Sequence, residues 1–306
     1  MISNLFDVAE PVSEALGQRR PVVALESTLI AQGLPWPQNL ETARAAEQAV
    51  RSAGAVPATI AILQGRVIVG AGEAALEYLA RAPGIRKAST RDLGPCLATR
   101  ADAATTVSAT MRIAHLSGIR VFATGGIGGV HPRIPGAPLD VSADLIELSR
   151  TPVAVVCAGA KSILDLPATL EVLETLGVPV LGYRSDRFAA FYVQASELPV
   201  SARLDTTADL AAACTAHWAL NGAGLLVAQP LQPPHDLPRE EFDRIWQKAD
   251  SIARLQGVNG PALTPFLLGR IAEISDGRTL RANHELIVAN ARLAGELAVS
   301  LAQEKT

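Results

Sequence analysis

The chain has 306 residues, of which 49% are hydrophobic and 19% charged, so it can bury a sizeable core. Its formal net charge is −3 and its pI is near 6.0. This balance supplies no basic surface, which argues against binding polymeric DNA or RNA but allows a small anionic ligand.

The three cysteines and residues 1–10 indicate in which cellular compartment the protein is expected. Cys96, Cys157 and Cys214 are far apart and show no paired spacing, which argues against a disulfide framework and a thiolate zinc site. Residues 1–10 carry acids and lack the basic and apolar segments of a signal peptide, and no segment is long enough to span a bilayer. We therefore expect a cytoplasmic protein that does not enter the membrane.

The first third of the chain predicts a mixture of strands and helices. The predicted elements are a strand at 21–25, a helix at 39–53, a hairpin formed by 58–63 and 66–69, and a helix at 73–82. Asn39 is the expected cap for the first helix, which ends at Gly54. The hairpin signal is Gln64-Gly65 between two apolar runs, and it indicates a mixed rather than wholly parallel sheet.

The middle of the chain alternates strands with helices. The predicted elements are a helix at 101–116, a strand at 119–123, a helix from a Ser142 cap to 149, an apolar strand that begins at Pro152, a helix at 167–176 and a strand at 178–181. This βα alternation is typical of an α/β fold. A glycine-rich loop, residues 124–130, follows the strand at 119–123.

The last third is predominantly helical. The predicted elements are a helix at 209–220, a strand at 223–228 and helices from Arg239 to the end, with a long one at 280–302. Residues 230–238 are proline-rich, but a stretch this short fits a surface loop better than a domain boundary. We therefore predict one α/β domain over residues 1–306, with a mixed, largely parallel sheet.

Reactive or glycine-rich segments follow three of the predicted strands. These segments are Glu26-Ser27-Thr28, Thr124-Gly125-Gly126 and Gly159-Ala160-Lys161. Open α/β sheets bind ligands at the carboxyl ends of their strands, so we expect these segments to lie together at one site.

Lys161 directly follows an apolar run that predicts a buried strand. Burial disfavours the charged form of a lysine, and a neutral amine can attack a carbonyl carbon. Imine chemistry is therefore the first hypothesis. The alternative is that Lys161 reaches solvent as its helix begins, because lysine side chains extend readily toward water.

Carboxylates supply further candidates. A buried Glu26 is suited to act as an acid near neutral pH, and the alternative is a helix cap or an ion pair with an arginine. Asp140 and Asp144 lie four residues apart beside a helix start, where they either bind a hard divalent cation, mostly through water, or cap the helix. Spacing alone does not decide between these alternatives.

Other polar residues suit a phosphate or a polar base. Residues 87–92 supply two cations, two hydroxyls and an acid, although a solvated turn has the same composition. The glycines of the 124–130 loop allow close approach of an anion, but they match neither a dinucleotide fingerprint nor a Walker loop. His131 ends that loop. Asn283 and Asn290 share one face of the last helix, where they either point into the cleft or pack as satisfied amides.

Five stretches resemble the pseudouridine-5'-phosphate glycosidase family, which includes indigoidine synthase A. They run in order along nearly the whole chain: residues 25–33 (LESTLIAQG), 105–111 (TTVSATM), 122–131 (FATGGIGGVH), 140–144 (DVSAD) and 156–165 (VCAGAKSILD). The tail, with Asn283 and Asn290, is similar as well. The resemblance implies a three-layer α/β/α fold with a mixed, largely parallel sheet, and a homotrimer.

The resemblance also implies an activity, which is reversible cleavage of the C–C bond in pseudouridine 5'-phosphate to uracil and ribose 5-phosphate, with a divalent metal such as manganese. Uracil is a poor leaving group through carbon, and an imine at C1' of the opened ribose provides an electron sink for its departure. Lys161 matches the family's nucleophile, Glu26 its proton donor and Asp140 its metal ligand. The matches to substrate-contacting positions are Lys87, Val107, Ser142, Ala143, Asp144 and Asn283.

The sequence departs from the family pattern at residues 132–138, where Pro-Arg-Ile-Pro-Gly-Ala-Pro replaces a more usual basic, glycine-containing stretch. This difference affects the expected geometry of the loop beside the metal ligand Asp140. Two other enzymatic interpretations use the same lysine, namely a Schiff-base lyase or aldolase on another sugar phosphate and a pigment-pathway role like that of indigoidine synthase A. A non-enzymatic nucleotide-binding module is the third interpretation, and it would tolerate loss of Lys161.

Overall fold

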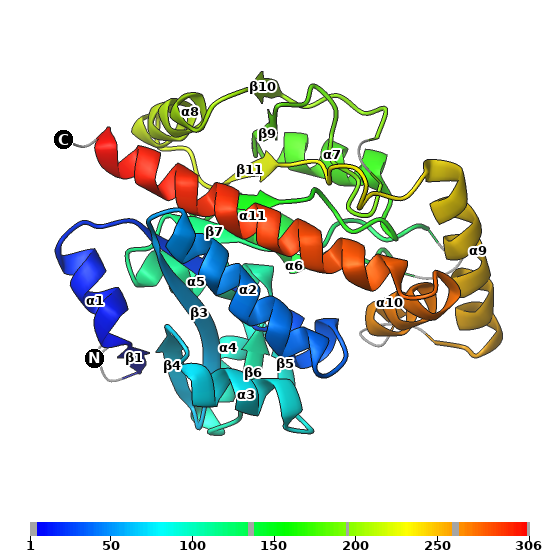
Figure 1. Ribbon diagram of the computed structural model, residues 1–306, viewed down its shortest axis with the longest axis horizontal. Helices are drawn as coiled ribbons and strands as arrows, with labels where there is room; N and C mark the ends of the chain where they lie inside the picture. The colour runs from blue at the N-terminus through cyan, green and yellow to red at the C-terminus, as the bar shows by residue number, and fades with distance from the viewer. Residues whose placement is uncertain (1–4, 134–137, 194–195, 259–262, 305–306) are drawn as a thin grey trace.

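The protein is built around a mixed, mostly parallel sheet (Figure 1). The computed structural model describes residues 5–133, 138–193, 196–258 and 263–304. In this part of the chain the strand order is β1-β4-β3-β2-β7-β8-β11-β9-β10, and β6 pairs with β3 and β5. Only the β3–β4 and β3–β6 pairs are antiparallel among the described strands. The expected sheet type is thereby confirmed.

The strands are short and separated by helices or turns. They are β1 (Phe6–Val8), β2 (Val22–Leu25), β3 (Val56–Leu63), β4 (Arg66–Val69), β5 (Arg86–Ala88), β6 (Ala103–Thr105), β7 (Val121–Ala123), β8 (Ala154–Cys157), β9 (Val180–Tyr183), β10 (Ala202–Leu204) and β11 (Leu225–Ala228). The helices are α1 (Glu10–Gly17), η2 (Leu29–Gly33), α2 (Gln38–Ser52), α3 (Glu73–Arg81), η3 (Thr90–Asp92), α4 (Leu93–Ala98), α5 (Val107–Leu116), α6 (Ala143–Leu148), α7 (Leu166–Thr175), α8 (Thr207–Ala219), α9 (Arg239–Leu255), α10 (Leu263–Ile274) and α11 (Arg278–Gln303).

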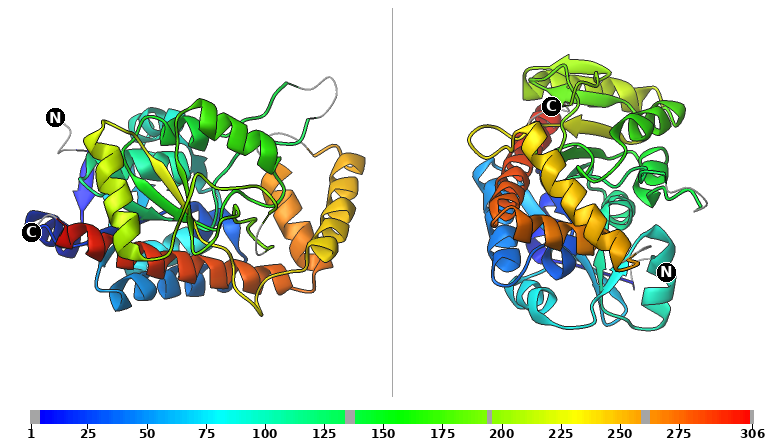
Figure 2. Two further views of the ribbon diagram at one scale, coloured as in Figure 1. Left: turned by 90° about the horizontal axis from the view of Figure 1, so that it is seen from above. Right: turned by 90° about the vertical axis from the view of Figure 1, so that its right-hand side faces the viewer.

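Helices cover both faces of the sheet. The long α11 crosses β2, β7 and β8 on one face and packs along α2 and α8, whereas α5 packs against β2, β3 and β7 from the other face. Helices α9 and α10 lie together at one end of the molecule, beyond the sheet (Figures 1 and 2). No helix in the described ranges is long and apolar enough to cross a membrane.

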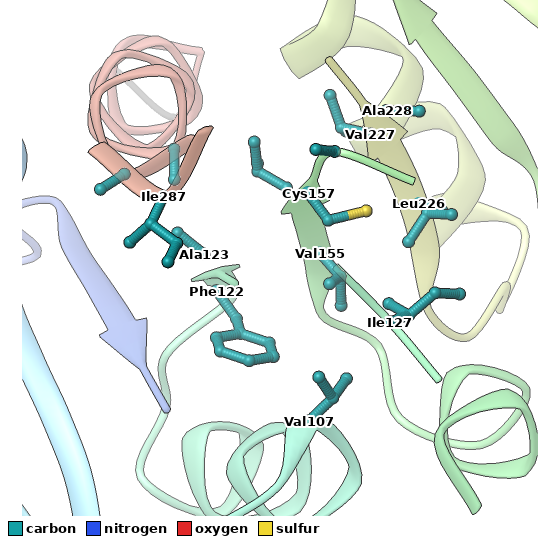
Figure 3. Packing of buried hydrophobic residues seen from close by; sticks show 14 of the residues in the cluster. Val107, Phe122, Ala123, Ile127, Val155, Cys157, Leu226, Val227, Ala228 and Ile287 are labelled. Carbon is teal, nitrogen blue, oxygen red and sulfur yellow. The ribbon is translucent and has the colours of Figure 1, made fainter. Parts of the chain in front are cut away.

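The core lies on both sides of the central strands. In β7, Phe122 points toward Val107 of α5, and the next residue, Ala123, faces Ile287 of α11 (Figure 3). Successive side chains of a strand point to opposite faces, and here both faces are buried. The apolar runs of the sequence therefore form strands that are covered by helices on both sides.

Strand register brings the candidate segments to one edge of the sheet. Leu25 pairs with Ala123, and Ala123 pairs with Val156, in parallel ladders. The residues that come next along these strands therefore leave the sheet side by side. An isolated bridge between Ile127 and Ala160 continues the contact beyond the strands.

Most expected elements are confirmed within one or two residues, but the helix expected over 101–116 is not one element. Residues 103–105 form β6, and the helix begins at Val107. The strand forms because Ala103 and Ala104 pair with β3, and the Thr105 hydroxyl donates to the carbonyl of Ile60 at 2.8 Å. This long-range pairing outweighs the helical preference of an alanine-rich segment.

The expected Asn39 cap is wrong. Asn39 lies inside α2, is 3% exposed, and donates to the carbonyls of Ile30 at 2.7 Å and Ala80 at 3.0 Å. Its side chain thus joins three segments of the chain, because a buried amide is stable only when it is hydrogen-bonded.

Candidate active site

A cavity of about 1330 Å³ lies where the candidate segments leave the sheet. Helices α9 and α10 contribute Trp246, Asp250, Arg254 and Leu267 to its wall. All the candidate site residues line it, namely Glu26, Lys87, Val107, Asp140, Ser142, Ala143, Asp144, Lys161 and Asn283. The structure therefore brings together residues that are spread over most of the sequence, at the position where α/β sheets bind ligands.

Glu26 immediately follows β2, and both of its carboxylate oxygens are held. The hydroxyl of Thr124, just after β7, donates to one oxygen, and the hydroxyl of Thr28 donates to the other. Among the described residues no ion pair involves Glu26, so the alternative of an arginine partner is not what the structure shows. The half-buried carboxyl group lines the cavity and can exchange a proton with a bound molecule.

Lys161 lies in the loop between β8 and α7. Its backbone amide donates to the carbonyl of Ile127 at 3.1 Å, and its own carbonyl accepts from the amide of Leu164 at 3.0 Å. The side chain is half-buried and lines the cavity. The loop is therefore fixed by backbone hydrogen bonds, and the amine is available to a bound molecule.

The loop before Lys161 has no room for a larger residue at Gly159. This glycine has φ +80°, and a Cβ atom built there would lie 1.9 Å from the carbonyl oxygen of Ala189. Gly126 is similarly close to the ring of Phe191, where a Cβ atom would meet it at 2.7 Å. Glycine is thus required where the two loops pass close to their neighbours.

Lys87, on β5, is the second cation of the cavity. Its side chain reaches the solvent of the open cavity, but the surrounding protein lowers its pKa, first through loss of hydration and then through the charge of Lys161. Asp144 and Glu26 act in the opposite direction, toward a higher pKa. The other three charged groups are therefore close enough to Lys87 to influence its pKa.

Asp144 is buried and serves as a double acceptor. One carboxylate oxygen accepts from the amide of Ser108, in the first turn of α5, at 2.9 Å, and the other accepts from the amide of Gly128 at 2.8 Å. The Ser142 hydroxyl caps α6 by accepting from the Asp144 amide at 3.2 Å, which confirms the expected cap. Asp144 thus joins α5, α6 and the glycine-rich loop.

Asp140 differs from Asp144 because it is exposed at the cavity. Its carbonyl accepts from the amide of His131 at 3.0 Å. The ring of His131 is half-buried. Burial lowers the pKa of His131, the charge of Asp140 opposes that shift, and the charges of Lys161 and Lys87 add to it.

The loop 132–138, which differs from the family pattern in sequence, is described only in part. Residues 134–137 lie outside the described residues, whereas Pro132, Arg133 and Pro138 line the cavity.

Few side chains in the described part of the chain could act as ligands to a metal ion. No group of three or more His, Cys, Asp or Glu side chains suited to a metal ion occurs among the described residues. A hard divalent cation often keeps several waters and uses one or two carboxylates together with substrate oxygens. Asp140, an exposed carboxylate on the cavity wall, fits such a water-mediated site.

The two asparagines of α11 have different surroundings. Asn283 is 6% exposed and lines the cavity, close to Gly125. Asn290 is 1% exposed and donates to the carbonyls of Thr124 at 2.9 Å and Gly125 at 3.3 Å. Of the two readings of this pair, a side chain in the cleft fits Asn283 and a satisfied amide fits Asn290.

Sequence reasoning did not identify the residues that α9 contributes. Arg254 donates to Asp250 at 2.7 Å on the cavity wall, and Trp246 lies one turn before Asp250. The helix is amphipathic in sequence, but that pattern predicts only a buried face and not what the face covers. Arg91, whose side chain is 87% exposed, also lines the cavity and belongs to the polar 87–92 segment.

Comparison with known proteins places the chain in a defined group. Residues 11–300 match the family described as indigoidine synthase A like protein. The chain is 50% identical to a pseudouridine-5'-phosphate glycosidase of Caldanaerobacter subterraneus subsp. tengcongensis, over 98% of both chains. It is 51% identical to the enzyme of the same name from Methylobacterium nodulans, over 97% of this chain and 88% of the other.

Solved structures show the same fold. A prealnumycin C-glycosynthase in complex with ribulose 5-phosphate has a TM-score of 0.90 and 42% identity, over 98% of both chains. An indigoidine synthase A-like protein from Thermotoga maritima has a TM-score of 0.84 and 37% identity, over 92% of this chain and 93% of the other. The expected fold class is confirmed by both similarities.

Proposed function

The chain belongs to the indigoidine synthase A-like family, and from this premise we propose that it is a pseudouridine-5'-phosphate glycosidase. The enzyme cleaves the C–C glycosidic bond of pseudouridine 5'-phosphate reversibly, to uracil and ribose 5-phosphate. The observation that carries the proposal is a single cavity that holds an accessible lysine and a hydrogen-bonded carboxyl group, in a chain about half identical over its length to enzymes of this name. The similar C-glycosynthase, with its sugar phosphate, supports C–C glycosidic chemistry on this fold.

Lys161 is the proposed nucleophile. Its deprotonated amine forms a bond to C1' as the bond between C1' and the ring oxygen O4' breaks, which opens the ribose ring. The attacking nitrogen then loses a proton to the Glu26 carboxylate, which gave its own proton to O4'. The restored nitrogen lone pair forms an iminium ion as the bond from C1' to C5 of uracil breaks, and the electron pair of that bond goes to C5, which takes the proton from Glu26. Water hydrolyses the imine, releases ribose 5-phosphate and restores the amine.

Glu26 is the proposed proton donor. Ring opening leaves an alkoxide at O4' unless a proton arrives there, and departure of uracil requires a proton at C5. The hydroxyls of Thr124 and Thr28 occupy one lone pair on each oxygen of Glu26, which leaves the remaining lone pairs for the transferred proton.

The remaining cavity residues are proposed to contact the substrate. Lys87 supplies a positive charge for the phosphate, and Asn283 supplies an amide for the polar edge of uracil or for the phosphate. Val107, Ser142, Ala143 and Asp144 line the same wall, and Asp144 also fixes the two loops that shape it.

A divalent cation, with manganese the proposed ion, is part of this site. Asp140 would hold it through its exposed carboxylate, largely by way of water. When bound, such an ion supplies positive charge that neutralises substrate oxygens.

Assembly and location are also inferred. We propose a homotrimer on the basis of the family resemblance alone. A cytoplasmic location is supported by the three cysteines, which are all free and buried and therefore suit a reducing compartment.

Uracil release from pseudouridine 5'-phosphate tests the function. We expect release by the wild type with manganese, none with Lys161→Ala, and little from unphosphorylated pseudouridine. A protein that releases no uracil, but forms an aldehyde from another sugar phosphate, would be the alternative lyase or aldolase. Retention of uracil release by Lys161→Ala would contradict the imine mechanism.

A further inference from the structure

Glu26 lies between the substrate cavity and a second, much smaller space. A cavity of about 20 Å³, large enough for about one water molecule, lies behind it. Glu26, Leu29 and Gly125 line both cavities, whereas Thr124 lines only the small one and is 4% exposed. We therefore expect a substrate in the large cavity to contact Glu26 and not Thr124.

Two hydroxyls determine how the Glu26 carboxyl group is oriented. Thr28 belongs to the same segment as Glu26, whereas Thr124 directly follows β7, the neighbouring strand of the sheet, 98 residues along the chain. The Thr124 hydroxyl thus links the proton donor to the strand beside it. A glutamate side chain has three rotatable torsions, so a fixed partner on one oxygen restricts its position at the cavity wall.

Asn290 in turn fixes the backbone that carries Thr124. Its amide nitrogen donates to the carbonyls of both Thr124 and Gly125, from helix α11 on one face of the sheet. Asn290 is 1% exposed and is absent from the lining of either cavity. A chain of contacts therefore runs from α11 through β7 to the carboxyl group of Glu26.

We propose that Thr124 is a positioning residue for Glu26, and that Asn290 sets the position of Thr124. The proposal rests on the glycosidase function proposed above, because it assigns Glu26 the proton transfers. Thr124 does not touch the substrate. Its hydroxyl keeps the carboxyl group of Glu26 within reach of the atom that receives the proton, and a misplacement of about 1 Å can cost about a hundredfold in rate.

The test compares Thr124→Val, which removes the hydroxyl and keeps the shape, with Thr124→Ser, which keeps the hydroxyl. Thr99→Val is the matched control, because the Thr99 hydroxyl lies at the exposed end of α4, where it donates to the Pro95 carbonyl at 2.8 Å. For each protein, kcat and KM are measured for uracil release, and thermal unfolding reports folding.

A partial reaction separates positioning of Glu26 from general damage to the site. Ribose 5-phosphate opens to its aldehyde in solution, so its imine with Lys161 forms without the proton that Glu26 delivers to uracil. Borohydride reduces this imine to a stable amine, and mass spectrometry then measures the labelled fraction. Labelling therefore reports whether the cavity still binds the sugar phosphate beside Lys161.

We expect Thr124→Val to lower kcat by about 10- to 100-fold with KM changed less than about threefold, while labelling stays at the wild-type level. Thr124→Ser should keep at least about a third of kcat, and Asn290→Ala should show the same pattern as Thr124→Val but more weakly. A Thr124→Val protein with wild-type kcat, or one whose labelling falls together with kcat, overturns the positioning role. A wild type that releases no uracil overturns the proposed function itself.

Discussion

The surroundings of Lys87 in the cavity destabilise the charged form of its side chain. Loss of hydration and the nearby charge of Lys161 lower the pKa of Lys87 from its ordinary value of 10.5. The folded protein therefore holds the Lys87 proton less tightly than the unfolded chain does. By linkage, the charged form costs stability at every pH below the lowered pKa, and this cost disappears as the pH rises through 10.5.

Replacement of Lys87 by methionine, which has a similar shape and no charge, should separate stability from function. At pH 7 we expect Lys87→Met to unfold about 1–3 °C above the wild type, a small gain because the side chain reaches solvent. The same variant should raise KM for pseudouridine 5'-phosphate about tenfold or more, because a cation is lost. Thermal unfolding between pH 7 and 10 checks the sign, and the gap between the two proteins should narrow toward pH 10. A variant less stable than the wild type at pH 7 would contradict this account of Lys87.

At the scale of elements, the loop between β8 and α7 depends on close packing more than on backbone freedom alone. Gly159 and Gly118 have similar φ angles of +80° and +84°, but a Cβ atom at Gly118 would meet nothing within 4 Å. At Gly159 a Cβ atom would lie 1.9 Å from a backbone oxygen. Alanine substitutions at Gly118 and Gly159 therefore separate the cost of a positive φ angle from the cost of a clash between the Cβ atom and the backbone.

We expect Gly118→Ala to lower the free energy of unfolding by about 1 kcal/mol, the usual cost of a positive φ outside glycine. Gly159→Ala should cost at least about 3 kcal/mol more, because backbone must move, and it should abolish uracil release by displacing Lys161. Urea unfolding followed by circular dichroism measures both. Equal midpoints for the two variants would show that the β8–α7 loop adapts without cost.

Local patterns explain which elements the sequence predicts well. The β3–β4 hairpin and the βα alternation depend on residues close together in the chain, so periodicity and turn residues identify them. β6 is different, because Ala103–Thr105 becomes a strand only through pairing with β3, and Asn39 resembles a cap although its partners are Ile30 and Ala80. Distant contacts decide both cases.

The site follows the same rule. Glu26 and Lys161 could be predicted because they follow strands that end at one edge of the sheet, which the fold class implies, whereas the other candidate residues are assigned by the family resemblance. The sequence also predicts Thr124 at this edge, but its hydrogen bond to Glu26, 98 residues away along the chain, has no local signal. The α9 wall with Trp246 and Arg254 likewise depends on how the last helices pack, and amphipathic periodicity does not specify the surface that a helix covers.

At the scale of the whole molecule, we expect folding to be independent of the proposed metal ion. The core is a large apolar cluster on both faces of the sheet, and burial of apolar surface is the main stabilising contribution. Asp140, the residue proposed to hold the metal, is exposed on the cavity wall and lies outside that cluster. Structural metal sites supply folding free energy through several protein ligands, and no such cluster occurs in the described ranges.

Metal removal should therefore abolish activity without unfolding the protein. After treatment with EDTA we expect no uracil release and a melting temperature within about 3 °C of the manganese-saturated enzyme, with the shift following free manganese by mass action. Asp140→Asn should melt where the EDTA-treated wild type melts, whatever the manganese concentration, because the variant lacks the ligand that couples the ion to the fold. Calorimetry across a manganese titration, read beside the uracil assay, checks both. A fall of 10 °C or more on metal removal would mean that the ion stabilises the fold itself, and a shift that persists in Asp140→Asn would place the ion on other residues.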